Sequence, residues 1–365
     1  MKSKFICYII CFLMLSFSGC IEEYTPKDIK EIKDLLVVDG TITNGESVFK
    51  ISRSVGLSEQ LYEATPIYNA EVYVETDSGD IFPAEEEDWD WGPSPWGSSL
   101  DYGGDGGFIF PGGWGADATY TIQMGELDPD KKYRLHIAID NEIYKSNYLS
   151  PLISPPIDNV FSEKPGDGKP VSIYVSTHDP QNQSKFYKWS YEEHWEIRAE
   201  LVASSKCWGK DQSKTFLLGG TDKISENIIS RQKINEINPS NEKLSILYYI
   251  SVKQTLLRNE AYAYYRNLQK NVELTGGLFS AMPSEMKGNI ECITDPDTYV
   301  IGYIEVATIT EKSLFINPKY YEPIRDLLCY VPPGPGGSEG TIPLRCTDCR
   351  FKPNASQDKP DFWPQ

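Results

Sequence analysis

Three residues with acid–base and metal-binding side chains, Glu192, His194 and Glu196, alternate along one predicted strand that runs from Phe186 to Ala199. Successive side chains of a strand point to opposite faces, so all three project from the same face. Two carboxylates beside an imidazole suit proton transfer or a divalent cation. Lys188 lies on the same face, however, and indicates ordinary charge balance on a solvated strand. We therefore predict no catalytic residue, no metal site and no cofactor.

The opposite face of this strand is apolar and is expected to enter a core. Glu193 is its only break, among Tyr187, Trp189, Tyr191, Trp195 and Ile197. Two further histidines, His136 within a strand and His178 before a turn, are isolated in the sequence. We interpret both as structural.

Cysteines offer a second possible chemistry near the C-terminus. Cys346-Thr347-Asp348-Cys349 has the spacing of a redox pair or of half a zinc site, but no second such pair and no strand-then-helix pattern accompanies it. A bridge from Cys329 to Cys346 or Cys349 would instead clamp the Pro/Gly loop 331–340 and add about 3 kcal/mol of stability. We favour this disulfide clamp, and the pairing among all five downstream cysteines stays open, including Cys207 and Cys292.

A long interruption, residues 85–118, carries tryptophans among Gly, Pro and acidic residues and shows neither helical nor strand periodicity. Exposed aromatic side chains on loops stack on sugar rings or form interface hot spots. An insertion folded back on its own aromatics is the alternative, and a calcium site is weaker because the Asp spacing matches no recognised oxygen-ligand loop. The candidates for ligand or partner binding are Trp89, Trp91, Trp96, Trp114, Asp88 and Asp90.

The N-terminus has the pattern of a lipoprotein signal peptide. Lys2 and Lys4 precede an apolar run from Phe5 to Phe17, which is shorter than the roughly 20 residues of a spanning helix. Small residues then lead to Cys20. We predict that residues 1–19 are removed and that Cys20 receives the fatty acids of a membrane anchor.

Residues 20–34 are predicted to be an acidic tether. Ile21-Glu22-Glu23 resembles the surface-export signal of Bacteroidota lipoproteins. That resemblance implies a lipid-anchored protein of the outer membrane that faces the cell exterior.

The chain has 365 residues, 40% of them hydrophobic, and a formal net charge of −18. The length and the hydrophobic content predict two packed domains. The acidic charge excludes nucleic acid as a favoured partner, because its phosphates are bound by Lys and Arg. It favours cationic or neutral ligands, or a complementary protein face.

Short alternating segments between Gly, Asn and Pro turns predict an all-β domain over residues 35–149. Leu127-Asp128-Pro129 followed by Tyr133 resembles the tyrosine corner of immunoglobulin-like and fibronectin-type sandwiches, in which the phenol hydrogen-bonds to the backbone of the corner. We predict an immunoglobulin/fibronectin-like β-sandwich that the 85–118 insertion interrupts. Its strands are expected at 35–38, 48–55, 71–76, 119–124, 133–139 and 144–149.

A Pro-rich linker, residues 150–157, is predicted to precede a second β-rich domain, residues 158–330. One amphipathic helix, about 260–273, follows from the spacing of its apolar residues, which predicts core packing. Residues 331–365 complete the chain as a Pro/Gly loop and a cysteine-containing tail. The strands of this domain are expected at 158–162, 171–177, 186–199, 244–254, 300–308 and 313–316.

Several motifs along the chain are characteristic when taken together. They are Leu36-Val37-Val38-Asp39-Gly40, Tyr187 to Glu196, Cys207-Trp208, Tyr249 to Phe279, Gly288-Asn289-Ile290, Ile301-Gly302-Tyr303, Leu314-Phe315-Ile316, Cys346-Thr347-Asp348-Cys349 and Lys359-Pro360-Asp361-Phe362-Trp363. They resemble a family of Bacteroidota outer-membrane lipoproteins known as domain of unknown function 4249. Members of that family are typically encoded beside TonB-dependent transporters, which implies an accessory role at the outer face of a transporter. The resemblance implies no catalytic residue.

Different classes of function are compatible with these features. The first is a non-enzymatic binding or docking protein that serves a TonB-dependent transporter in nutrient uptake, with a possible glycan or peptide ligand. The chain has no HExxH helix, P-loop or GxGxxG turn. The alternatives are a surface hydrolase of glycans or peptides, with carboxylates from the insertion or from Glu192 and Glu196, and an adhesive or scaffolding module.

Overall fold

The protein is mainly β, with several antiparallel sheets and one α-helix among the residues that the computed structural model describes. The predicted fold class, a β-sandwich followed by a second β-rich part with one amphipathic helix, is confirmed. The described residues are 35–54, 65–87, 118–164, 166, 169–183, 185–199, 201–202, 205–213, 215–223, 226–238, 241–273, 288–317, 329 and 342–364.

The first sandwich is formed by the alternating segments that follow the predicted tether. One sheet places β2 (Gly45–Arg53) between β1 (Leu36–Ile42) and β7 (Ala118–Gly125). The facing sheet places β8 (Tyr133–Ile139) between β4 (Glu71–Thr76) and β9 (Glu142–Ser146). Alternate side chains of these strands fill one core. Short strands extend the sheets: β3 (Thr65–Pro66), β5 (Ile81–Pro83) and β6 (Glu85–Glu86).

The predicted tyrosine corner is confirmed. Tyr133 is buried at the start of β8, and its hydroxyl accepts a hydrogen bond of 2.8 Å from the backbone N–H of Asp128. Leu127 is buried beside it. The corner therefore fixes the entry of the chain into the central strand of the second sheet.

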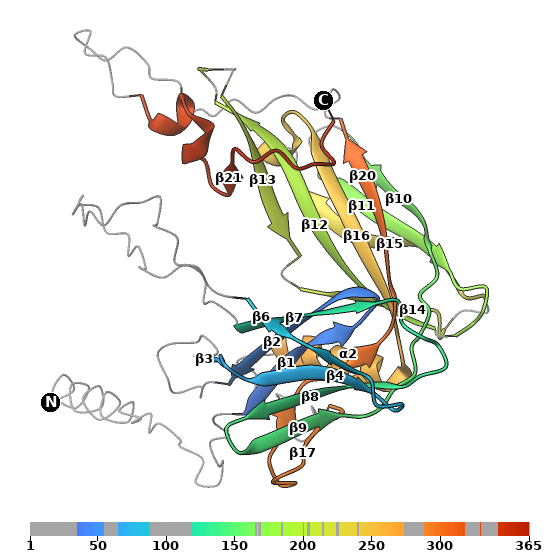
Figure 1. The fold of residues 1–365 in the computed structure, drawn as a ribbon. Helices are drawn as coiled ribbons and strands as arrows, with labels where there is room; N and C mark the ends of the chain where they lie inside the picture. The colour runs from blue at the N-terminus through green and yellow to red at the C-terminus, as the bar shows by residue number, and fades with distance from the viewer. Residues whose placement is uncertain are drawn as a thin grey trace, which may run out of the picture.

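Three late strands complete the first sandwich. β18 (Val300–Ile301) and β19 (Glu305–Val306) pair parallel with β1, and β17 (Ile290–Cys292) pairs antiparallel with β9. Figure 1 shows β17, in orange, beside the green β9. The predicted boundaries 35–149 and 158–330 therefore do not separate the two sandwiches, because residues 288–307 return to the first one.

The second sandwich packs a three-stranded sheet against a six-stranded sheet. The central strands β12 (Phe186–Arg198) and β16 (Tyr248–Leu257) pair antiparallel over ten positions. The apolar face predicted for β12 lies in this core, where Tyr187 and Trp189 are fully buried. The remaining strands are β10 (Ile157–Glu163), β11 (Val171–His178), β13 (Lys206–Gln212), β14 (Leu217–Gly220), β15 (Ile228–Ile237), β20 (Ile309–Ile316) and β21 (Ala355–Ser356).

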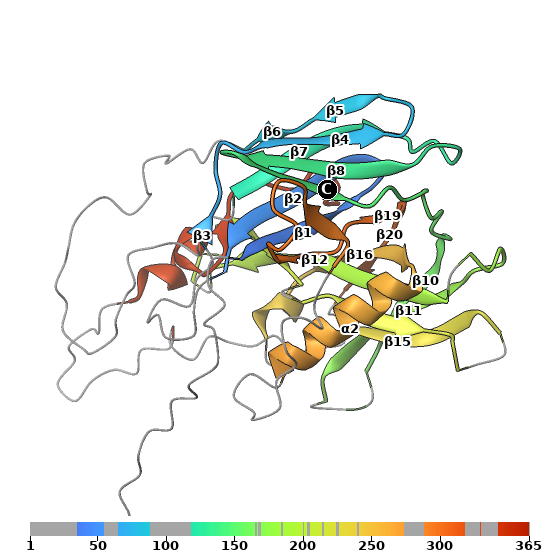
Figure 2. The ribbon, with the colours of Figure 1, turned by 90° about the horizontal axis from the view of Figure 1, so that it is seen from below.

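The helix α2 (Asn259–Glu273) follows β16 directly and agrees with the predicted range. Ala261, Tyr264 and Tyr265 are buried on one face, against Leu257 and Tyr303. Figure 2 shows α2 at the end of the second sandwich that adjoins the first, where the Tyr265 hydroxyl donates to the Tyr303 carbonyl. The apolar stripe is therefore core packing, as predicted.

A buried ion pair joins the two sandwiches beside this helix. Arg258, at the end of β16, donates from its guanidinium and its backbone to Glu305 of β19, which is fully buried. Burial raises the pKa of Glu305, although the Arg258 charge opposes the shift. The guanidinium also donates to the Ser150 carbonyl in the connector. These contacts hold the returning strands, the connector and the second sandwich in one arrangement.

Candidate functional site

An open pocket of about 290 Å³ lies at the edge of the second sandwich, between β12, β13, β15 and the 3-10 turn η1 (Glu242–Leu244). Its lining is mainly polar and combines amide, hydroxyl and carboxylate groups. Gln212, Thr215 and Asn241 are exposed at its rim. A pocket of this size and polarity suits part of a small polar ligand.

Glu193 forms the buried wall of the pocket and is the residue that breaks the apolar face of β12. Its carboxylate accepts hydrogen bonds from the Tyr248 hydroxyl at 2.5 Å and from the Asn235 amide at 3.2 Å. The Lys243 ammonium also donates to it. Every buried charge needs such partners, because desolvation is costly. Glu193 is therefore a fixed, fully hydrogen-bonded carboxylate.

Two carboxylates face each other across the strand pair at this point. Glu193 of β12 is directly opposite Asp211 of β13 in the register, an arrangement of like charges that is destabilising by itself. Lys243 offsets the repulsion, because its ammonium contacts Glu193 and lies 3.1 Å from Asp211. The same ammonium lies 4.6 Å from the ring centroid of Trp195.

The local sequence of η1 places Lys243 above the strands. Asn241 caps the turn, and its side-chain oxygen accepts a hydrogen bond of 3.1 Å from the Lys243 backbone N–H. Leu244 is buried and anchors the turn in the core. The lysine is therefore directed inward by a short capped turn.

Two tyrosine hydroxyls beside the carboxylates remain protonated over the physiological range. Burial, together with the charges of Glu193 and Asp211, raises the pKa of Tyr191 to about 12. Burial also raises the pKa of Tyr248 well above its ordinary value, with the Glu193 charge adding to the effect. Tyr248 consequently acts as a permanent hydrogen-bond donor to Glu193. The pocket thus presents neutral donors and acceptors around one ion cluster.

On the face of β12 that carries Glu192, His194 and Glu196, the side chains form separate pairs. Glu192 and His194 are in contact, with His194 Nε2 lying 2.7 Å from Glu192 Oε1. Glu196 instead pairs with Arg198. No group of three potential metal ligands from His, Cys, Asp and Glu occurs within the described residues. The three residues are therefore not gathered into one centre.

This face is also less solvated than the strand pattern predicted. His194 is buried, because the Phe362 ring from the C-terminal tail packs edge-on against it with the ring centroids 5.1 Å apart. Burial opposes ionisation of Glu192, but the hydrogen bond with His194 and the charge of Lys210 hold the pKa of Glu192 below its ordinary value. The tail converts part of a solvent face into a small aromatic cluster.

The remaining histidines lie apart from the pocket. His136 is buried on β8 and stacks on Tyr73, with the ring centroids 4.2 Å apart. His178 is exposed at the end of β11, where its Nδ1 lies 2.8 Å from Asp158. Neither histidine lines the pocket, and the two do not share a site.

Two disulfides join the cysteines near the C-terminus. Cys329 pairs with Cys346, which is one of the two pairings considered for the clamp. Cys349 instead pairs with Cys207, 142 residues away in the sequence. Cys292 is free and buried on β17. Because each sulfur is engaged in a separate bridge, Cys346 and Cys349 form neither a redox pair with each other nor half of a zinc site.

Several predicted site residues lie outside the described residues. These include Cys20 with the signal segment 1–19 and the tether, and also the Pro/Gly loop 331–340. The binding candidates of the insertion lie there as well: Trp89, Trp91, Trp96, Trp114, Asp88 and Asp90.

The pocket residues were not predicted as a site. The one available signal was Glu193, a charged residue on an otherwise apolar strand face. Asp211, Asn235 and Lys243 stand on separate elements. The register of β12 and β13 places Asp211 opposite Glu193, whereas Asn235 comes from β15 in the other sheet and Lys243 from η1. No spacing rule in the sequence connects them.

The fold and the pocket define a two-sandwich β protein with a polar surface pocket. The chain belongs to the family described as Domain of unknown function (DUF4249), whose model matches residues 21–313. A search of curated proteins found no match. Across the described part of the chain, no helix has the length and apolar character that a membrane crossing requires.

Proposed function

We propose that this protein is a non-enzymatic binding and docking protein of the outer membrane. It is anchored through lipidated Cys20, faces the cell exterior, and serves as an accessory partner of a TonB-dependent transporter in nutrient uptake. A glycan or a peptide is the proposed class of ligand. The supports are the signal pattern of residues 1–20, the family and the chemistry of the pocket.

The observation that carries the binding role is the position of Lys243. Cleavage of a glycoside by two carboxyl groups needs both to reach the scissile bond or a water between them, at separations of roughly 5 to 10 Å. Here the Lys243 ammonium contacts both Glu193 and Asp211 and stands in that space. The arrangement favours holding a polar ligand at the rim over turnover of a bond between the carboxylates.

The rim residues supply the groups that a neutral polar ligand requires. Gln212 and Asn241 offer amide donors and acceptors, and Thr215 offers a hydroxyl. Sugars and peptide backbones present the complementary groups. The alternative functions, a surface hydrolase or an adhesive or scaffolding module, are tested by the same experiments.

The anchor and the partner are tested in native membranes. Protein extracted from outer membranes in mild detergent is expected to lack residues 1–19, to carry fatty acid on Cys20 and to co-purify with a large β-barrel protein. Cys20→Ala is the matched control and should leave the membrane fraction. Retention of residues 1–19, or wild-type protein that purifies without a barrel, contradicts the proposal.

The pocket is tested with a panel of neutral oligosaccharides and short peptides by calorimetry on the full chain. Gln212→Ala and Asn241→Ala should weaken binding of any responding compound about tenfold or more, because each removes a rim hydrogen bond. Gln123→Ala, on the exposed face of β7, is the control. The hydrolase would be favoured instead if the wild type turned over a panel member and Asp211→Asn lost that turnover without a change in its melting temperature.

A further inference from the structure

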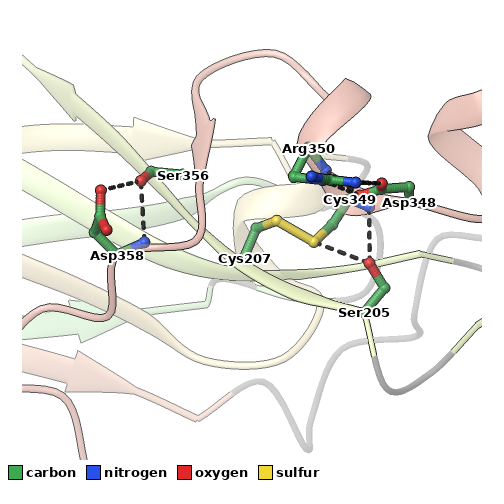
Figure 3. Close-up of a disulfide and its surroundings, with 7 residues drawn as sticks. All are labelled: Ser205, Cys207, Asp348, Cys349, Arg350, Ser356 and Asp358. Carbon is green, nitrogen blue, oxygen red and sulfur yellow. Dashed lines mark hydrogen bonds and ion pairs between the residues drawn. A yellow bond between two sulfur atoms is a disulfide. The ribbon is translucent and has the colours of Figure 1, made fainter.

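Two segments far apart in the sequence form one end of the second sandwich, which we term the clamped tip. They are the described residues where β12 ends and β13 begins, 198–199, 201–202 and 205–206, and the tail segment 342–352 with the 3-10 turns η5 (Leu344–Cys346) and η6 (Cys349–Phe351). The Leu201 N–H donates to the Cys346 carbonyl at 2.9 Å. Figure 3 shows the Ser205 hydroxyl beside Cys349, whose backbone N–H donates to it at 3.0 Å.

Both disulfides of the protein end in the clamped tip. Cys207–Cys349 attaches η6 to β13, and Cys329–Cys346 attaches η5 to the preceding chain. Each 3-10 turn has three residues, too few to bury a core of its own. The sulfurs point inward and fix the backbone covalently. The shape of the tip is therefore set before any partner arrives, which reduces the entropy lost on binding.

The apolar side chains of the clamped tip point outward. Leu201 is 53% exposed, Leu344 is 61% exposed and Phe351 is 40% exposed. Val202 and Ile342, beside them in the sequence, are also exposed. Scattered apolar residues are ordinary on surfaces, but a gathered set on a rigid frame marks an interaction site.

The charge of the tip is opposite to that of the whole protein. Segments 198–206 and 342–352 contain five basic and two acidic residues, and Glu196 and Glu242 pair with Arg198 and Lys352, so the tip keeps an excess of one positive charge in a chain with a net charge of −18. Arg198 Nε lies 2.8 Å from Glu196, and Arg350 Nε lies 2.9 Å from Asp348. These contacts hold each guanidinium in place and leave further N–H donors for a partner.

We propose that the clamped tip is a docking surface for a protein partner whose contact area has an apolar centre and an acidic rim. The guanidiniums of Arg198 and Arg350 are held in place and would complement acidic side chains at the rim of the partner's contact area. An anionic bilayer would meet the same charges, and an adduct to lipid in the test below would identify it. The inference rests on the proposed docking function and deepens it by naming the face that meets the partner.

The test uses photo-crosslinking of the full chain in native outer membranes. Leu344 is replaced by p-benzoylphenylalanine, and the same substitution at Ile81, which is equally exposed on β5, is the matched control. We expect a protein adduct from position 344 and none from position 81. Sequencing of the adduct should place the crosslink on an apolar residue flanked by Asp or Glu. Melting temperature and intact disulfides, measured by mass spectrometry, verify the fold of each variant.

Reversing the charge of two tip arginines tests whether the partner presents an acidic rim. Arg198→Glu and Arg350→Glu together should reduce the yield of the Leu344 adduct about tenfold or more. Lys253→Glu, an exposed reversal on β16, should leave the yield unchanged. An unchanged yield in the double variant would overturn the charge complementarity on which the proposal rests.

Four other results overturn the proposal: an adduct to lipid, an adduct within the same chain, an adduct to a second copy, or no adduct at position 344. The failures of the two proposals are separable. If the wild-type protein co-purifies with a β-barrel but position 344 yields no protein adduct, the tip is not the docking face and the proposed function stands. If position 344 instead crosslinks to a protein with an acidic rim that is not a transporter barrel, the proposal for the clamped tip is supported and the proposed transporter role is contradicted.

Discussion

At the scale of single residues, the most informative feature is the lysine shared by two facing carboxylates. Glu193 and Asp211 oppose each other across β12 and β13, and Lys243 contacts both. Glu193 is almost fully buried, so its charge depends on these contacts. The pocket chemistry and the local stability of the sheet therefore rest on the same cluster.

Lys243→Met tests this dependence. Removal of the ammonium leaves a buried carboxylate opposite a second one, and the free energy of unfolding should fall by about 3 kcal/mol. Adding Glu193→Gln should restore most of the loss, because the uncompensated buried charge is then gone. Urea denaturation near neutral pH measures both variants, with Lys206→Met on the exposed turn as control. Equal losses in the single and double variants would contradict the account.

A second prediction concerns acid stability and Glu75 on β4. Burial opposes ionisation of this carboxyl, but the hydrogen bond from Arg134 at 2.6 Å, with the charges of Arg134 and Lys145, holds its pKa below the ordinary value of 4.5. A depressed pKa in the folded state gives stability that is present above the unfolded pKa and lost as the pH falls through the folded pKa.

Glu75→Gln should therefore be less stable than the wild type at neutral pH, and the difference should shrink below about pH 4.5. Thermal melting across that range measures it. Glu126→Gln, on the exposed turn after β7, should show no such convergence. A constant difference at every pH would show that Glu75 does not contribute through its charge.

At the scale of elements, the returning segment 288–307 decides how the sandwiches are joined. Asn289 is buried, and its amide exchanges two hydrogen bonds of 2.8 Å with the backbone of Ile304. Gly288 passes so close to Gly302 that a Cβ on Gly288 would lie 1.5 Å from the Gly302 carbonyl oxygen. Gly288 and Asn289 thus have a structural role in the return.

Asn289→Ala should lower the free energy of unfolding by about 2 to 3 kcal/mol, because it leaves the buried N–H and C=O of Ile304 without their partner. Chemical denaturation measures the loss. Amide hydrogen exchange should show faster exchange in β17 and β19 than in β12. A variant with wild-type stability would mean that water replaces the amide there.

The two disulfides provide a further prediction about elements. Their chain separations are 142 residues for Cys207–Cys349 and 17 residues for Cys329–Cys346. The chain-entropy model assigns roughly 5 kcal/mol to the longer loop and roughly 3 kcal/mol to the shorter. The double variant Cys207→Ala/Cys349→Ala should therefore unfold at a lower urea concentration than Cys329→Ala/Cys346→Ala. The reverse order would contradict the larger stabilisation expected from the Cys207–Cys349 disulfide.

At the scale of the whole molecule, the chain leaves the first sandwich, forms the second and returns, so we expect the two sandwiches to fold as one unit. Ile290, Ile304 and Val306 from the returning strands are buried in the first core. The buried pair of Arg258 and Glu305 connects that core to the second sandwich. Separate folding of either half would expose surfaces that the other half covers.

A chain truncated after residue 157 should therefore fail to fold, although it contains the tyrosine corner and most strands of the first sandwich. It should bind a hydrophobic dye and show no cooperative unfolding, whereas the full chain should unfold cooperatively. Adding a peptide of residues 288–307 should restore part of the structure. A cooperative transition in the truncated chain alone would show that the return is an attachment and not part of the core.

The sequence by itself determined the local structure of this protein. Strand alternation assigned the buried face of β12, and helical spacing assigned the buried face of α2, because these patterns report burial within one element. The tyrosine corner was equally readable, since all of its groups lie within a few residues.

Only the tertiary structure decided which distant segments meet. The return of residues 288–307, the pairing of Cys207 with Cys349 and the gathering of Glu193, Asp211 and Lys243 each depend on which distant elements pack together. The packing of Phe362 against His194 likewise depends on where the C-terminal tail crosses the sheet. Local periodicity fixes which face of an element is buried, but the free energy that selects its partner is a sum of long-range contacts that no single segment encodes.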